Sequence, residues 1–309
     1  MKRQFSVFEG RIAHVETGEI PVDVYTIPTH EEQRYLTEEL GIDEHTLASA
    51  MDPEETPRIE FEDEYTVIII KYPRNYSPED HFLFRVTSMG IFLFPNRVVI
   101  VNDDEIPLFM GKTASKVYTV QDVLLRTLTQ IVRHFQSHLR AIMMCREEIE
   151  SQMGEGDDSE SLMDMFILEK SLVYYVNALS GNRRVLERMS LSMSKFNFTE
   201  DNSELLEDLQ IENHQYLDQA QVNSQVLSNL VSTRSNLIDN NLNVLMKNMN
   251  AIVIAISVPT FFTGVFGMSE FTMMMNPVIP WYVSFPLFLF AMIGVGFFVY
   301  WLVQKFERH

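Results

Sequence analysis

The most constraining feature of the chain is an uncharged run between Lys247 and Glu270, near its C-terminal end. A helix needs about 20 apolar residues to cross the ~30 Å hydrocarbon core of a bilayer, and this run is long enough. A second uncharged run covers residues 281–303, after a short connection marked by prolines. Two such runs so close together predict a membrane hairpin, with spanning helices at about 249–268 and 281–303.

Small and polar residues recur along the first run at spacings of three, four and seven. Asn250, Ser257, Thr260, Gly264 and Gly267 therefore share one face of a helix. Such a helix face suits close packing between helices, and it equally suits the lining of a water-filled pore. The residues alone leave both structures open.

Helical periodicity begins well before the membrane. From about residue 201 the apolar residues keep spacings of three, four or seven, and no helix breaker occurs before Pro259. We expect one continuous helix over about 201–268, roughly 100 Å long at 1.5 Å per residue. A helix of that length needs neighbours, so self-association is expected.

Residues 1–118 have the mixed pattern of an α/β domain. Apolar and β-branched runs predict strands of a mixed sheet at 22–27, 65–72, 82–87, 89–94 and 97–101. Thr29 with Glu32 forms a capping box, and Asp43 can cap a second short helix. We therefore expect a sheet with helical cover.

Residues 119–248 are predicted to form a helical region of three helices. Thr119 with Asp122 begins a helix that ends near Met153, before a Gly- and Asp-rich break. A second helix is predicted over 159–195. Asp201 with Glu204 can cap the third, which leads into the first membrane span over about 249–268.

Charge and cysteine content exclude several classes of function. The formal net charge is -19, which argues against nucleic-acid binding because phosphates require clustered Lys and Arg. Cys145 is the single cysteine, so neither an intrachain disulfide nor a cysteine zinc site is expected. No phosphate loop, nucleophile elbow or His-Glu-x-x-His motif occurs, so we predict neither an enzyme nor a resident cofactor.

The distribution of charge also predicts orientation. Lys247 precedes the first span, Lys305 and Arg308 follow the second, and the connecting loop carries Glu270 without Lys or Arg. The start of the sequence lacks the apolar core of a signal peptide. By the positive-inside rule, both termini are expected in the cytoplasm of a multi-pass plasma (inner) membrane protein.

The segment 264–269, Gly-Val-Phe-Gly-Met-Ser, resembles the end of the first span in the CorA family of divalent-cation channels, which reads Tyr-Gly-Met-Asn. The resemblance extends to Asn243-Val-Leu-Met-Lys and to Pro259-Thr-Phe-Phe. It implies a cytosolic α/β domain, a long stalk helix continuing into the first span, a short loop and a second span. It also implies a funnel-shaped homopentamer in contact with lipid that transports divalent cations passively, with Mg²⁺ as the expected ion and Co²⁺ or Ni²⁺ as further candidates.

The resemblance assigns roles to particular residues. Eight are expected to line the pore: Asn243, Met246, Met249, Asn250, Val253, Ser257, Thr260 and Gly264. Met246 and Met249 would form apolar constrictions, which can gate by dewetting. Gly267, Met268 and Ser269, with Glu270 beside them, would form the selectivity motif. Because Ser269 replaces an amide with a shorter hydroxyl, we expect altered ion affinity or preference.

One regulatory residue follows from the same resemblance. Asp208 on the stalk would share Mg²⁺ with a neighbouring subunit, with Glu79 or Asp80 as candidate partner, and an ordinary solvated helix face is the alternative. His134 and His138 have metal-ligand spacing, but without a carboxylate partner they are predicted to be helix surface. Two other functions stay open. One is a Zn²⁺ or other transition-metal transporter, and the other is a non-conducting membrane-anchored scaffold or sensor.

Overall fold

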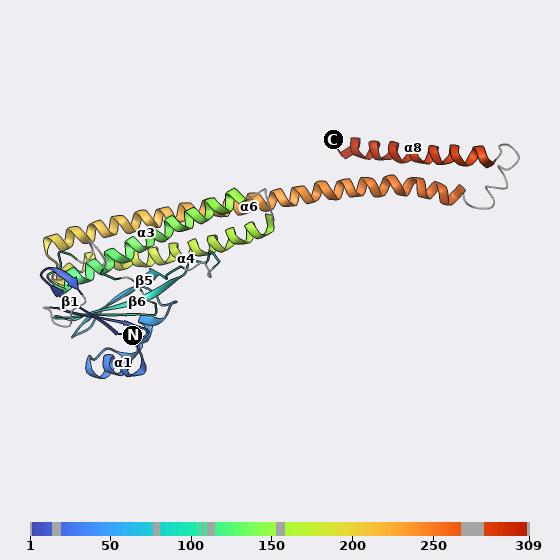
Figure 1. Cartoon of the computed structure of the whole chain (residues 1–309). Helices are drawn as coiled ribbons and strands as arrows, with labels where there is room; N and C mark the ends of the chain where they lie inside the picture. The colour runs from blue at the N-terminus through green and yellow to red at the C-terminus, as the bar shows by residue number, and fades with distance from the viewer. Residues whose placement is uncertain are drawn as a thin grey trace. The chain divides into compact units, whose positions relative to one another are not determined.

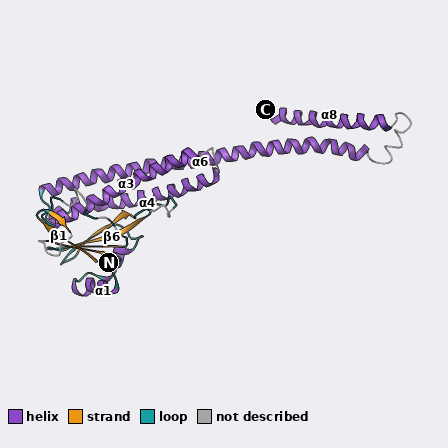
Figure 2. Cartoon of the chain, viewed as in Figure 1, coloured by secondary structure: helices purple, strands orange, loops and turns teal. Residues whose placement is uncertain are grey.

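The computed structural model describes residues 2–13, 20–76, 81–104, 106, 108–109, 115–152, 158–266 and 281–307. The chain divides into two compact units, residues 1–231 and residues 232–309. Figure 1 shows the order of the elements along the chain, and Figure 2 distinguishes the helices from the strands. The first unit holds a sheet covered by helices, and the second holds the predicted membrane hairpin.

The sheet has seven strands in the order β2-β1-β3-β7-β6-β5-β4. Its strands are β1 Lys2–Phe8, β2 Arg11–Ala13, β3 Pro21–Thr26, β4 Arg58–Phe61, β5 Thr66–Pro73, β6 Val86–Leu93 and β7 Val98–Asn102. Only β3 and β7 pair in parallel, so the sheet is mixed, as predicted. The inner strands β5, β6 and β7 are buried almost throughout, which explains their continuous apolar runs.

The prediction of separate strands at 82–87 and 89–94 is wrong. One strand, β6, replaces them, and it pairs with β5 from Pro73 opposite Val86 to Thr66 opposite Leu93. Ser88 and Gly90 interrupt the apolar pattern in the sequence, yet both lie inside the ladder. Three strands, β1, β2 and β4, were not predicted because their polar residues hide a short apolar alternation.

Short helices cover one face of the sheet. They are the π-helix η1 Tyr35–Glu39 and α2 Glu44–Met51, and α1 His30–Arg34 leads directly into η1. Both predicted caps are confirmed. Thr29 and Glu32 exchange side-chain-to-backbone hydrogen bonds of 3.3 and 2.8 Å, and the Asp43 carboxylate accepts from Thr46 N at 2.9 Å.

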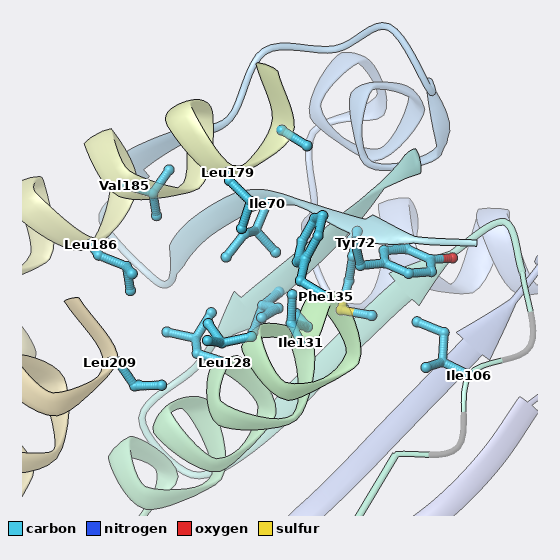
Figure 3. Close-up of a cluster of buried hydrophobic side chains, with 14 of the residues drawn as sticks. Ile70, Tyr72, Ile106, Leu128, Ile131, Phe135, Leu179, Val185, Leu186 and Leu209 are labelled. Atoms are coloured by element: carbon cyan, nitrogen blue, oxygen red, sulfur yellow. The ribbon is translucent and has the colours of Figure 1, made fainter. Parts of the chain in front are cut away.

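Two long helices cover the other face: α3 Val120–Gln152 and α4 Asp158–Leu191. Figure 3 shows Leu128, Ile131 and Phe135 of α3 in one cluster with the strand residue Ile70 and with Leu179 of α4. The N-terminal part of α6 (Glu200–Phe266) adds Leu209 to the same core. Burial of these apolar side chains joins the sheet and the three helices into one unit.

Two buried polar residues of α4 bind backbone groups of β5 and of the segment that precedes β6. β4 pairs with β5 only as far as Ile69, and beyond that point Asn182 takes the place of a strand. Its side-chain carbonyl accepts a hydrogen bond from Lys71 N at 2.9 Å, and its side-chain amide donates one to Lys71 O at 2.7 Å. Ser171 Oγ likewise accepts from Phe84 N at 3.0 Å. These bonds satisfy backbone groups that would otherwise be buried without partners.

The predicted helix over 159–195 and the predicted cap of the next helix need correction. α4 ends at Leu191, a short helix α5 (Met193–Phe196) follows, and Asn197 then adopts a left-handed conformation that ends it. Thr199 and Asn202 form the reciprocal cap of α6 through two bonds of 3.2 Å, in place of Asp201 and Glu204. From there α6 is continuous for 67 residues, and the second unit is completed by α8 (Trp281–Glu307).

Candidate ion pathway

The second unit exposes α6 on every side over residues 241–250. Nothing in the described part of the same chain covers this segment, although it carries several large apolar side chains. Met246 and Met249 are 59% and 56% exposed. Apolar groups left uncovered on a single helix require either lipid or further protein around them.

Every residue predicted to line a pore lies on α6 and is exposed. Within this set we call the following positions the stripe: Asn243, Met246, Asn250, Val253, Ser257, Thr260 and Gly264. Val253 is 58% exposed, and a Cβ added at Gly264 would find no atom within 4 Å. The stripe carries no charge and no His or Cys.

The hydroxyl groups of the stripe donate to their own helix. Ser257 Oγ donates to Val253 O at 2.7 Å, and Thr260 Oγ1 donates to Ile256 O at 2.8 Å. Each hydroxyl therefore uses its one proton within α6 and keeps its oxygen lone pairs as acceptors. These two hydroxyl oxygens suit ligands that present hydrogen-bond donors, such as the water molecules around a hydrated cation.

Helix α8 packs on the side of α6 that lies opposite Ser257 and Gly264, and Thr260 of the stripe lies at the edge of this contact. A Cβ added at Gly296 of α8 would lie 3.3 Å from Ala255 O and 3.5 Å from Pro259 Cγ. At 3.6 residues per turn, Ala255 and Pro259 face away from Ser257 and Gly264. The partner helix of the hairpin thus leaves the stripe uncovered.

Two helices of the described chain are long and apolar enough to cross a membrane, one within α6 and one within α8. Their apolar windows are 6% and 0% buried, whereas the core helix of a soluble protein would be mostly buried. Length, composition and exposure together favour the predicted membrane hairpin.

The predicted selectivity motif, Gly267, Met268, Ser269 and Glu270, lies outside the described residues. The structure therefore does not test the role predicted for this motif, which stays a prediction. α6 ends at Phe266, one residue before the motif begins.

Asp208 is exposed on α6, next to the exposed Glu207. Among the described residues, no group of three His, Cys, Asp or Glu side chains could hold a metal ion. Its candidate partners, Glu79 and Asp80, lie outside the described residues. The predicted regulatory site therefore stays a prediction, and it requires a second subunit.

The expectation that His134 and His138 are ordinary helix surface is wrong. His138 is buried, and its Nδ1 lies 2.8 Å from the Tyr175 hydroxyl. The two imidazole rings lie 4.4 Å apart, and burial lowers the pKa of both. Cys145 is half-buried against the same core, and burial raises the pKa of its thiol, which lowers the fraction present as the reactive thiolate.

Comparison with known proteins agrees with this arrangement. A family model described as "CorA-like Mg2+ transporter protein" matches residues 24–305. The chain is 26% identical to a protein of Methanocaldococcus jannaschii named "Cobalt/magnesium transport protein CorA", and the match covers 94% of this chain and 95% of that protein.

Solved structures share the fold. The complete structure of the CorA magnesium transporter from Methanocaldococcus jannaschii matches with a TM-score of 0.71 and 21% identity, over 100% of this chain and 98% of that one. The structure of full-length CmaX matches with a TM-score of 0.67 and 16% identity, over 99% and 97% of the two chains. Both matches extend over both units of the chain.

Proposed function

Because the chain belongs to the CorA-like Mg2+ transporter family, we propose that it conducts divalent cations, with Mg²⁺ as the principal ion, through a pore formed by several copies of α6. Cobalt enters as a second candidate ion because the related archaeal protein is named for both metals. A dication that crosses a membrane potential gains about 4.6 kcal/mol per 100 mV, so transport requires no chemical energy source.

The observation that carries the proposal is the exposure of the stripe on the side of α6 opposite α8. Small-residue packing within the hairpin does not use this face, because Gly296 of α8 meets Ala255 and Pro259. Copies of α6 arranged around an axis would bring the stripe to the interior and leave α8 outside.

The chemistry of the stripe favours a hydrated ion. Mg²⁺ dehydrates reluctantly and keeps its waters in a tight octahedron. Ser257 and Thr260 present oxygen acceptors to such waters, because their protons are committed to carbonyls of α6. A transporter of partly dehydrated Zn²⁺ would need His, Cys or carboxylate ligands, and the stripe has none.

The finer features of the proposal follow from the family resemblance. We propose a homopentamer with cytosolic domains at 1–118 and 119–248, a membrane domain at 249–309 and both termini in the cytoplasm. Lipid would surround the hairpins in the plasma membrane. Mg²⁺ shared between Asp208 and a neighbouring subunit would hold the closed state, since an ion that binds one state more tightly shifts the population toward it.

Reconstitution into liposomes that contain a Mg²⁺-sensitive dye tests this function. With an inside-negative potential, we expect Mg²⁺ uptake that stops when the potential is dissipated, together with measurable uptake of Co²⁺ or Ni²⁺. Uptake of Zn²⁺ without Mg²⁺ would instead identify a transition-metal transporter. No uptake under any gradient would leave a scaffold or sensor as the function.

The serine of the motif offers a separate prediction. In the variant Ser269→Asn, a longer amide can contact the waters of the entering ion, so we expect the concentration for half-maximal Mg²⁺ uptake to fall severalfold. Ser284→Asn, in the second span, serves as the control for adding an amide elsewhere. Identical Mg²⁺ uptake by Ser269→Asn and the unmodified protein would remove the idea that Ser269 alters the filter.

A further inference from the structure

The first unit contains a cavity of about 660 Å³ that the transport proposal does not use. It lies where β5 extends beyond the end of β4, between the segment 53–57 and helix α4. Gly181 of α4 allows Pro57 to approach, because a Cβ there would lie 2.7 Å from Pro57 Cγ. One wall of the cavity is therefore closely packed. The cavity volume lies in the range typical of small-molecule sites.

Basic side chains dominate the cavity although the whole chain is strongly acidic. Five cationic residues line it: Lys71, Arg74, Arg85, Lys170 and Arg184. Only three carboxylates do so: Glu54, Glu55 and Asp103. In a chain with a formal net charge of -19, a local excess of positive charge favours an anionic ligand.

Two of the three carboxylates are already engaged. Glu55 Oε1 lies 2.6 Å from Arg58 Nη1, and Arg58 does not line the cavity. Asp103 Oδ1 accepts from Thr87 Oγ1 at 2.7 Å and from the Tyr72 hydroxyl at 3.2 Å. Thr87 and Tyr72 are neutral, so Asp103 keeps its charge, and five cations against three carboxylates still leave a net positive lining.

Three of the cations are available to a ligand. Lys71 Nζ donates to Ser88 Oγ, and Arg74 lies 3.7 Å from Asp104. Arg85, Lys170 and Arg184, in contrast, are exposed, and within the described part of the chain none lies within 4.0 Å of a carboxylate. Arg184 Nη1 donates to Ser180 Oγ at 3.3 Å, and its other donors stay available to a ligand. Two Arg forks and one Lys form a donor set that suits phosphate oxygens.

An aromatic ring completes the lining. Tyr174 is exposed at the cavity, and Lys170 Nζ lies 5.9 Å from the centre of its ring. A planar base can stack on such a ring while its phosphates meet the neighbouring cations. The cavity is also much larger than one phosphate ion requires.

We propose that this cavity binds a phosphate-bearing small anion, with a nucleotide as the source that fits the volume and Tyr174. The site lies entirely within residues 53–184, so it depends neither on the pore nor on the selectivity motif. The sequence pattern does not single out these cations, because they lie on or beside β5 and β6 and on α4, which are far apart along the chain.

Calorimetric titration of the full-length, detergent-purified chain tests the proposal. EDTA in the buffer removes divalent cations, so chelation of Mg²⁺ by the ligand cannot produce the signal. ADP and inorganic phosphate are titrated separately. Tighter binding of ADP identifies a nucleotide site, whereas equal binding identifies a free-phosphate site, and either result supports the phosphate chemistry.

Variants on α4 provide the matched comparison. Arg184→Ala is expected to weaken binding at least about tenfold, because one charge-assisted contact is lost. Arg184→Lys should restore part of the affinity. Arg188→Ala removes the same charge from an exposed position on the same helix outside the cavity and should leave binding unchanged.

Three results would overturn the proposal. One is the absence of saturable binding by both ADP and phosphate. Another is an equal loss of affinity in Arg184→Ala and Arg188→Ala, which would indicate attraction to overall charge. The third concerns the double variant Arg85→Ala with Arg184→Ala. If it binds the ligand normally but elutes as a smaller assembly, these two cations serve contacts between subunits instead.

Discussion

At the scale of single residues, His138 shows how burial sets the protonation of this core. Its ring lies edge-on to Phe84, and its Nδ1 contacts the Tyr175 hydroxyl at 2.8 Å. Burial lowers the pKa of His138 to about 4, and the neighbouring His134 adds to the shift. Burial raises the pKa of Tyr175, so both partners stay neutral near pH 7.

This environment predicts a pH-dependent stability. Between the unfolded pKa of about 6.5 and the folded pKa of about 4, the unfolded chain binds more protons, so stability is full above pH 6.5 and falls toward pH 4. At pH 5 the loss is about 2 kcal/mol. His138→Asn keeps a partner for Tyr175 without titrating, so its melting temperature should drop less between pH 7 and pH 5.

The control for this measurement is His214→Asn, at an exposed position on α6. It should melt with the same pH dependence as the unmodified protein. If His138→Asn also kept that dependence, burial of the imidazole would not be the source of acid sensitivity.

At the scale of elements, what could be predicted depends on whether the signal is local. Long helices follow from a periodicity repeated over many turns, and the caps at Thr29 and Asp43 involve neighbours three residues away. The bonds of Asn182 could not be predicted, because its partner Lys71 is 111 positions away in the sequence. β4 was missed for a different reason, because its four residues show too short an apolar alternation, although it pairs with the next strand, β5.

The contact between α6 and α8 yields a prediction at the same scale. Pro259 lacks an N–H, so Ala255 O has lost its helical partner, and Gly296 lies against this point. A side chain there would force the two helices apart. We expect Gly296→Leu to destabilise the membrane unit by about 1–3 kcal/mol, which is typical of overpacking.

Gly294 supplies the matched control, because a Cβ added there meets no atom within 4 Å. Size-exclusion chromatography after stepwise heating measures the stability of each variant assembly. Gly296→Leu should lose its assembly at a lower temperature than Gly294→Leu. Equal stability of the two variants would show that the helices do not pack as described.

At the scale of the whole molecule, the proposed pore requires other copies of the chain around the stripe. The sequence permitted two interpretations of the stripe, helix packing or a pore lining, because spacing places residues on a face without saying what meets that face. The structure shows that α8 packs on the opposite face. The motif from Gly267 to Glu270 lies outside the described residues, so the filter remains the part of the pathway that rests on resemblance.

Thiol modification in the flux assay tests most directly whether the stripe lines a water-filled passage. Cys145 is the single cysteine, so Cys145→Ser provides a cysteine-free background for one new thiol at a time. In Ser257→Cys, a charged, water-soluble thiol reagent should reduce Mg²⁺ uptake by tenfold or more, whereas Val258→Cys, turned away from the stripe, should keep its uptake. An unreactive Ser257→Cys, or equal block of the two variants, would contradict the pore.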